Sequence, residues 1–142
     1  MPLDYVVLGS HRAIVVRGEG VVALRDHEQL VARLLQEPAL EEGLPVLVDG
    51  RAITSATIDV ADLPHVVTLT RLLTKRGLDI IAIVTPLGPV RILARAFELG
   101  ARAVGVHASV FDELAPALVW LRLEPKELEN LQLDDPDQAS NG

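Results

Sequence analysis

The side chains best suited to chemistry lie close together in residues 49–59. Asp49 ends a short apolar run, and Arg51 follows it. Three hydroxyl side chains come next, those of Thr54, Ser55 and Thr57. The carboxylate could act as a general base or accept a phosphoryl group, and the hydroxyls could be phosphorylated. Because backbone amides and helix N-termini converge at the carboxyl ends of strands in open α/β sheets, we expect any function to be found first here.

Each of these groups also has a structural interpretation, which we favour. Asp49 most simply binds the amides of the following loop or pairs with Arg51. Hydroxyl groups in loops usually cap helices or satisfy turns. We therefore predict that residues 49–59 form a binding surface and that the chain has no catalytic residue.

Two further candidate groups lie later in the chain. Arg91 and Arg95 share a face of a predicted helix near its positive N-terminal end, so they could bind an anion. The alternative is that their aliphatic stems cover the apolar stripe of that helix. His107 is expected just past an apolar strand, near the same sheet edge as Asp49, where it could bind a ligand or take a surface or capping role.

Several kinds of site are excluded by what the sequence lacks. It has no cysteine, and its four histidines are scattered without the spacing of metal ligands, so we predict no metal site and no cofactor. Glycine-rich phosphate loops, dinucleotide fingerprints and nucleophile elbows are also missing. The chain has no basic stripe and few aromatic residues, which argues against nucleic acid as a partner.

The elements that position these side chains follow from composition and periodicity. Of the 142 residues, 49% are hydrophobic and only 3% aromatic, so we expect helices packed on a sheet rich in Val and Ile. Strands are predicted over residues 5–8, 13–17, 46–48, 79–84 and 103–106. Helices are predicted over residues 24–37, around 66–73, over 89–100 and over 111–123.

This order, β-β-α-β-α-β-α-β-α, predicts an α/β fold. We expect a single domain over residues 1–123, with a small mixed, mostly parallel sheet of about five strands and four helices. Residues 124–142 carry −5 of the net charge of −7 and are expected to form a mobile acidic tail. Because the sequence shows no leader peptide and no apolar stretch long enough for a bilayer, we expect a cytoplasmic protein that does not insert into membranes.

The segments in this order resemble a known family. They are the opening hairpin and then GEGVVALRDHEQLVARLLQEPAL, GLPVLVDGRAITSATID, IVTPLGPVRILARAFE and VFDELAPALVWL. Over residues 4–123 they are similar to the STAS superfamily, in its SpoIIAA-like branch related to anti-sigma-factor antagonists. The resemblance implies a small mixed sheet with helices, no catalytic chemistry, binding of regulatory proteins in signalling, and relatives likened to lipid-carrying CRAL-TRIO domains.

The chain departs from the switch-type members of that family at one position. Those members carry Asp-Ser-Ser/Thr-Gly at the start of the second helix, where a partner kinase phosphorylates the first serine. The corresponding residues here are Thr57, Ile58, Asp59 and Val60, so Ile58 occupies the acceptor position. Because isoleucine cannot accept a phosphoryl group, we expect phosphorylation only if Thr57 or Ser55 substitutes for it.

Three hypotheses for function follow. The leading one is a regulatory domain that binds a protein through the loop from Arg51 to Thr57 and the helix starting near Asp59. The partner would be a regulator, a kinase or a second copy of the chain in a homodimer. The second hypothesis is a carrier or sensor of a small apolar, lipid-like ligand held between the second helix and the sheet. The third is a degenerate receiver-like signalling domain, because Thr85 after an apolar strand and then residues 96–114 resemble the end of receiver domains, with His107 where those have lysine.

Overall fold

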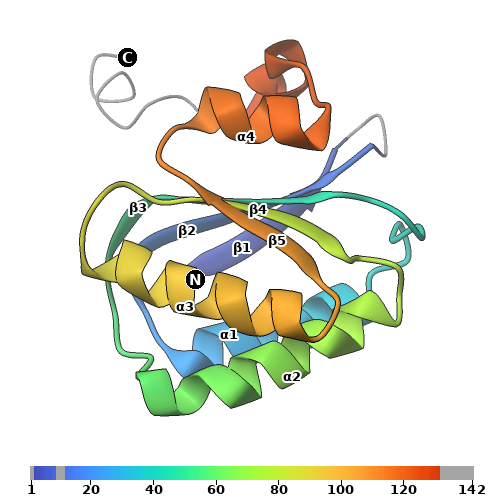
Figure 1. The fold of residues 1–142 in the computed structure, drawn as a ribbon. Coiled ribbons are helices and arrows are strands. Elements are labelled where there is room, and N and C mark those ends of the chain that lie inside the picture. The colour runs from blue at the N-terminus through green and yellow to red at the C-terminus, as the bar shows by residue number, and fades with distance from the viewer. Residues whose placement is uncertain (1, 9–11, 132–142) are drawn as a thin grey trace.

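A five-stranded sheet forms the centre of the molecule (Figure 1). In the computed structural model, which describes residues 2–8 and 12–131, the strands lie in chain order. They are β1 (Leu3–Val7), β2 (Ile14–Val22), β3 (Val46–Ala56), β4 (Ile80–Val84) and β5 (His107–Phe111). β1 pairs antiparallel with β2, and every later pair is parallel. The predicted mixed, mostly parallel sheet is confirmed.

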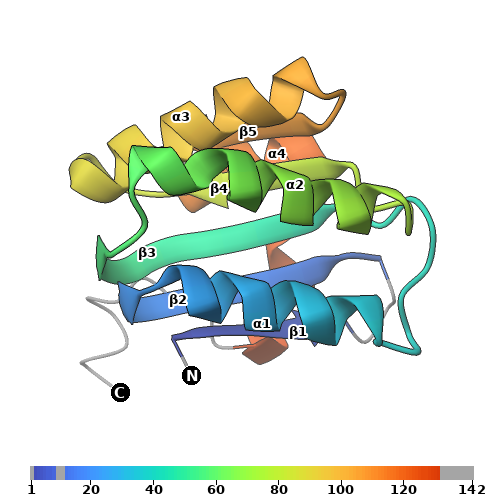
Figure 2. The same cartoon turned by 90° about the horizontal axis from the view of Figure 1, so that it is seen from below.

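The helices are divided unequally between the two faces of the sheet. Within the described residues they are α1 (Leu24–Leu35), α2 (Leu63–Thr74), α3 (Pro89–Ala103) and α4 (Leu114–Leu121), with the short 3-10 helices η1 (Val60–Asp62) and η2 (Pro125–Leu131). Figures 1 and 2 show α1, α2 and α3 on one face and α4 on the other. Each parallel crossover moves one strand further in the same direction, and right-handed crossovers of this kind place their helices on one face.

Two apolar cores result because successive strand residues point to opposite sides of the sheet. In β2, Ile14 and Val16 face α1–α3, whereas Val15 faces α4; in β3, Val46 and Leu47 divide in the same way. The buried hydrophobic residues of the described chain are all Leu, Val, Ile or Ala. Cover on both faces explains the continuous apolar runs of the central strands.

β3 is much longer than the predicted strand over 46–48, and the loop predicted after Asp49 is wrong. β2 also continues beyond its predicted end and pairs with the second half of β3. Glu19 lies opposite Ala52 after one shift of register, and Val22 lies opposite Ala56 after a second, both of the kind that β-bulges produce. Each extension supplies the hydrogen-bonding partner of the other, so neither could be derived from its own residues.

The strand predicted over 103–106 is also wrong, because α3 continues to Ala103 and β5 begins only at His107. Gly100, expected to end the helix, stays within it where α3 approaches α2. A Cβ at Gly100 would lie 3.1 Å from Val67 Cγ2. Gly105, whose φ is 88°, follows the helix end and adopts the left-handed conformation that commonly terminates helices.

The chain after β5 packs on the α4 face. The helix predicted over 111–123 begins only at Leu114, because Phe111 belongs to β5; a start just before Pro116 is what the missing amide proton of that proline predicts. Leu123 and Leu128 are buried in the same cluster as the α4 side chains, so packing continues into η2. The rest of the expected acidic tail, residues 132–142, lies outside the described residues.

Candidate functional site

Asp49 and Arg51 form an ion pair within β3. One Asp49 carboxylate oxygen accepts hydrogen bonds from the Arg51 backbone N (3.2 Å) and Nε (2.9 Å), and the other accepts one from Nη2 (3.0 Å). Asp49 is only 4% exposed, so this bidentate contact balances a nearly buried charge. Asp49 thus pairs with Arg51, as its structural interpretation predicts, and both of its carboxylate oxygens accept hydrogen bonds.

The polar residues that follow lie at the surface, where β3 ends and α2 is about to begin. They are Thr54, Ser55, Thr57 and Asp59, and together they form the rim. The Thr57 amide donates to the Val22 carbonyl at 2.9 Å, which holds the end of β3 against β2. The Asp59 amide donates to Asp62 Oδ2 at 2.9 Å at the start of η1. The rim is thus fixed by backbone contacts, and its side chains face outward.

Ile58, between two rim residues, behaves differently. Its side chain is partly buried and packs against the core under α1–α3. The position that would carry the phospho-acceptor of a switch-type antagonist is therefore occupied by an apolar side chain that packs inward.

His107 does not join this group. It pairs with Ile80 at the start of β4, whereas Asp49 pairs with Val84 at the end of β4. The expectation that His107 and Asp49 share a sheet edge is wrong, because His107 begins its strand instead of following it.

Arg91 and Arg95 have acidic partners. Arg91 forms an ion pair with Asp112, the residue after β5. Arg95 Nη1 lies 3.3 Å from Oε1 of Glu98, and the other oxygen of that nearly buried carboxylate accepts the Val110 amide at 2.7 Å. An anion at this face of α3 would have to displace carboxylates that are already bound.

The strand order does not provide the kind of crevice on which the expectation of a site at the carboxyl ends of the strands rested. Crevices at the carboxyl ends of parallel strands form where the strand order reverses. Here the order runs from β1 to β5 without reversal, and α1–α3 all cover one face. The same topology excludes the receiver alternative, because receiver domains have the strand order 2-1-3-4-5.

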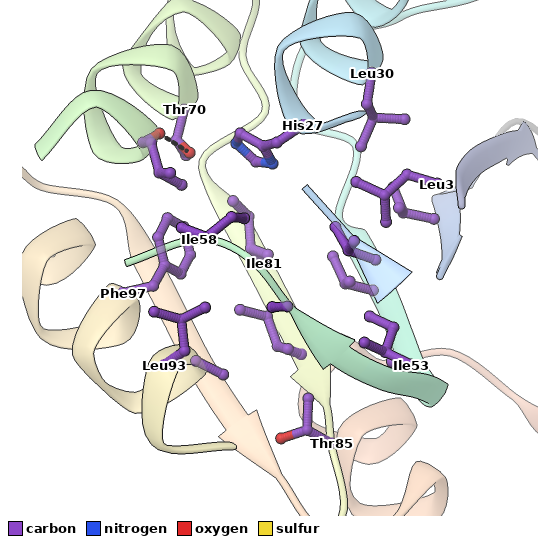
Figure 3. A pocket seen from close by; sticks show the side chains of 18 of the residues that line it. Leu3, His27, Leu30, Ile53, Ile58, Thr70, Ile81, Thr85, Leu93 and Phe97 are labelled. Atoms are coloured by element: carbon purple, nitrogen blue, oxygen red, sulfur yellow. Dashed lines mark hydrogen bonds between the residues drawn. The ribbon is translucent and has the colours of Figure 1, made fainter. Parts of the chain in front are cut away.

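A partly open apolar cavity of about 180 Å³ lies between the sheet and helices α1, α2 and α3 (Figure 3). Figure 3 shows Leu30 projecting from α1, Leu93 and Phe97 from α3, and Ile58 between them. Strand side chains that line the cavity include those of Val16, Val48, Ile53, Ile81 and Ile83. The cavity therefore lies inside the larger of the two cores, below the rim.

Three polar side chains line this cavity. The Thr70 hydroxyl is satisfied, since it donates to the Val66 carbonyl at 2.9 Å. His27 Nε2 and Thr85 Oγ1 are buried, and neither has a hydrogen-bond partner among the described residues. Burial, helped by the nearby His65 and opposed by Glu28, lowers the pKa of His27 to about 4, so its imidazole is neutral at pH 7.

Neither His27 nor Thr85 is among the site residues predicted from the sequence. A signal for His27 exists, because it precedes Leu30 and Val31 by three and four residues and so lies on the apolar face of α1. Thr85 directly follows an apolar strand and gives no local signal of its own. Only the packing of α1, α2 and β4 reveals that the two residues line one space.

Comparison with solved structures identifies the fold. A crystal structure of an uncharacterized protein from the DUF3478 family of Shewanella loihica PV-4, described as having a SpoIIAA-like fold, matches this chain. The match covers 84% of this chain and 91% of the other, with a TM-score of 0.52 and 16% identity. This chain has a SpoIIAA-like fold. No family model matches it, and no curated protein is significantly similar to it.

The SpoIIAA-like fold implied by the sequence resemblance is thus confirmed. In the described part of the chain, no group of three or more His, Cys, Asp or Glu residues could hold a metal ion. Nor does any described helix combine the length and apolar character needed to cross a bilayer.

Proposed function

We propose that this SpoIIAA-like domain is a non-enzymatic regulatory module that binds a small apolar ligand in the cavity between the sheet and α1–α3. The cavity itself, with its almost wholly apolar lining, is the observation that supports this proposal. Of the hypotheses drawn from the sequence, the carrier or sensor of a lipid-like molecule is the one that this geometry favours.

The volume of the cavity has an energetic consequence. A fully closed, empty cavity of this size would lower the free energy of unfolding by roughly 4 kcal/mol, at about 24 cal/mol per Å³, which is an upper limit here because the cavity is partly open. That is a large fraction of the total stability of a typical domain, about 5–15 kcal/mol. An apolar cavity of about 150 Å³ in another protein binds benzene, so a molecule of about one ring suits the space. An occupant would recover part of the lost packing.

The chemistry of the lining supports binding without turnover. His27 and Thr85 make no hydrogen bond to each other, so the cavity does not pair a hydroxyl nucleophile with a base. Asp49, the carboxylate that the sequence offered as a general base, is engaged by Arg51 and does not line the cavity.

Titration with toluene, followed by amide shifts in NMR spectra of the full chain, tests the proposal. We expect saturable shifts in residues around Ile58 and Leu93, both of which line the cavity. Ala94→Phe fills the space and should weaken toluene binding at least about tenfold. Ala103→Phe, on the exposed end of the same helix, is the matched control and should bind normally. Absence of saturable shifts, or normal binding by Ala94→Phe, would overturn the proposal.

A second candidate function is recognition of a protein regulator or kinase at the rim. Exposed hydroxyls and Asp59 lie beside Val60, an apolar residue that is 72% exposed. Ile58 lies between two rim residues and also lines the cavity, so a ligand in the cavity could change the surface that the rim presents to a protein partner. Thr57 and Ser55 are exposed and are the residues at which phosphorylation would add charge to the rim.

Pull-down from native cell extract tests this second candidate. The double variant Thr54→Glu/Thr57→Glu should lose a partner that the wild-type chain retains. Thr68→Glu, which places one glutamate on an exposed threonine of α2, away from the rim, serves as the control. Equal recovery by all three chains would remove the rim as the contact surface.

A further inference from the structure

The almost wholly apolar lining of the cavity includes two polar atoms that have no hydrogen-bond partner in the described chain. Almost every lining side chain is apolar, yet His27 Nε2 and Thr85 Oγ1 are buried without partners in the described chain. A buried polar atom without a hydrogen bond destabilises a fold, and such atoms are few in natural proteins. An occupant that carried one matching polar group would satisfy at least one of these atoms.

The two polar atoms are placed differently. Figure 3 shows the His27 ring projecting from α1 toward Thr70 and Ile81, with Thr85 at the opposite end of the drawn side chains. A Cβ at Gly50 would lie only 3.1 Å from the Thr85 methyl carbon Cγ2, so that methyl group packs against the Gly50 backbone on the cavity floor. Thr85 therefore turns its methyl group toward the Gly50 backbone, whereas the His27 ring lies among the lining side chains.

We infer that the ligand of this cavity has an apolar body of about one ring with a single uncharged hydroxyl, and that this hydroxyl bonds to His27 Nε2. The inference rests on the proposed function, because it names the class of molecule that the same cavity takes. Simple phenols and short branched or cyclic alcohols are ligands of this class.

The requirement for an uncharged ligand follows from the lining. No Asp, Glu, Lys or Arg side chain lines the cavity, so an ionised ligand would be buried without an opposite charge. His27 is itself neutral at pH 7, because burial depresses its pKa; the titratable groups that also act on it are His65 and Glu28, which lie 3.3 Å from each other. A hydroxyl both donates and accepts, so it can bond to either tautomer of a neutral imidazole.

Phenol and toluene test the inference, because they differ only in replacing a methyl group by a hydroxyl. The dissociation constants of both are measured by NMR titration for the wild-type chain, His27→Leu and Thr85→Val. We expect His27→Leu to lower the preference for phenol over toluene by about 3- to 10-fold, the worth of one net hydrogen bond. Toluene binding should survive in His27→Leu, which also reports that the variant is folded.

Other results would contradict either the inference or the proposed function. An unchanged phenol preference in His27→Leu overturns the inference and leaves the proposed function standing, as long as toluene still binds. Loss of the preference for phenol over toluene in Thr85→Val but not in His27→Leu overturns the inference, because the hydroxyl of the ligand then bonds to Thr85 and not to His27. Tighter binding of benzoate than of phenol at pH 7 overturns the inference that the ligand is uncharged. If neither phenol nor toluene binds the wild-type chain, the proposed function itself fails. Should His27→Leu not fold, His27→Phe takes its place.

Discussion

The nearly buried polar groups of this domain are of two kinds, those with partners and those without. Asp49 and Glu98 are each 4% exposed, and both carboxylates are held by arginine and backbone contacts. His27 Nε2 and Thr85 Oγ1 are buried without partners, and both residues line the same cavity. Two unsatisfied polar atoms that line the same cavity point to a binding site there, whereas a satisfied carboxylate is a structural feature.

Replacing His27 by Leu should flatten the acid side of the stability profile. The folded-state pKa of His27 is about 4, below the ordinary value of 6.5, so the unfolded chain takes up the proton first. The stabilisation that the neutral His27 contributes is therefore fully present above about pH 6.5. It is lost as the pH falls toward 4, and the free energy of unfolding drops by roughly 2 kcal/mol between pH 7 and pH 5. Urea denaturation at both pH values should show this loss in the wild-type chain and not in His27→Leu. Equal losses in the two chains would contradict it.

Asp49→Asn should destabilise the fold without affecting the cavity. Replacing the carboxylate by an amide breaks the bidentate contact with the mostly buried Arg51 guanidinium, at a cost of about 1–3 kcal/mol. Toluene affinity should not change, because Asp49 does not line the cavity. Asp59→Asn, at an exposed position, should stay within about 0.5 kcal/mol of the wild type. A loss of toluene binding in Asp49→Asn would show that the ion pair shapes the site.

At the scale of elements, two glycines show how closely the strands and helices approach. Gly50 lies in β3, where a Cβ would be 3.0 Å from the Val84 carbonyl oxygen. Gly100 lies in α3, where a Cβ would be 3.1 Å from the methyl group of Val67. A backbone carbonyl in the neighbouring strand cannot move aside, whereas the end of a half-buried valine side chain can.

The same substitution should thus have opposite effects at these two sites. Gly50→Ala should lower the free energy of unfolding by about 1–3 kcal/mol through overpacking. Gly100→Ala should leave it unchanged or raise it by up to about 1 kcal/mol, because alanine is the better helix former. Chemical denaturation of both variants checks the pair. A loss at Gly100 as large as that at Gly50 would show that the contact between α2 and α3 is rigid.

On the scale of the whole molecule, the two faces of the sheet have different roles. The face covered by α4 and η2 is a packed core without a lining residue of the cavity. The face covered by α1, α2 and α3 contains the cavity and lies next to the rim. Binding should accordingly affect one half of the molecule more than the other.

Hydrogen exchange in saturating toluene should show this difference. Amides from Ile58 to Leu63 and in α3 should exchange more slowly, because both segments contribute to the lining. Those of α4 should change only as far as global stability rises, by about 2.7 kcal/mol at a ligand concentration 100 times the dissociation constant. Mass spectrometry of peptides reads both regions together. Protection centred on α4 would contradict the location of the site.

The sequence by itself determined the types and order of the elements and hence the fold class. Hydrophobic spacing and the positions of Gly and Pro are local properties, so the opening hairpin and the first three helices could be predicted from them. Ile58 at the acceptor position of the resembling family, and the pairing of Asp49 with Arg51, also followed from neighbouring residues.

Only the tertiary structure decided where strands β2 and β3 end and where a ligand could bind. The polar second half of β3 is a strand because β2 supplies its partner, 33 positions earlier where Glu19 meets Ala52. The cavity is lined by residues from Leu3 to Phe97, and no local pattern encodes space that side chains leave unfilled. Hydrophobic periodicity determines which face of each element is buried. The volume of the cavity depends on how the buried faces of all the elements pack together.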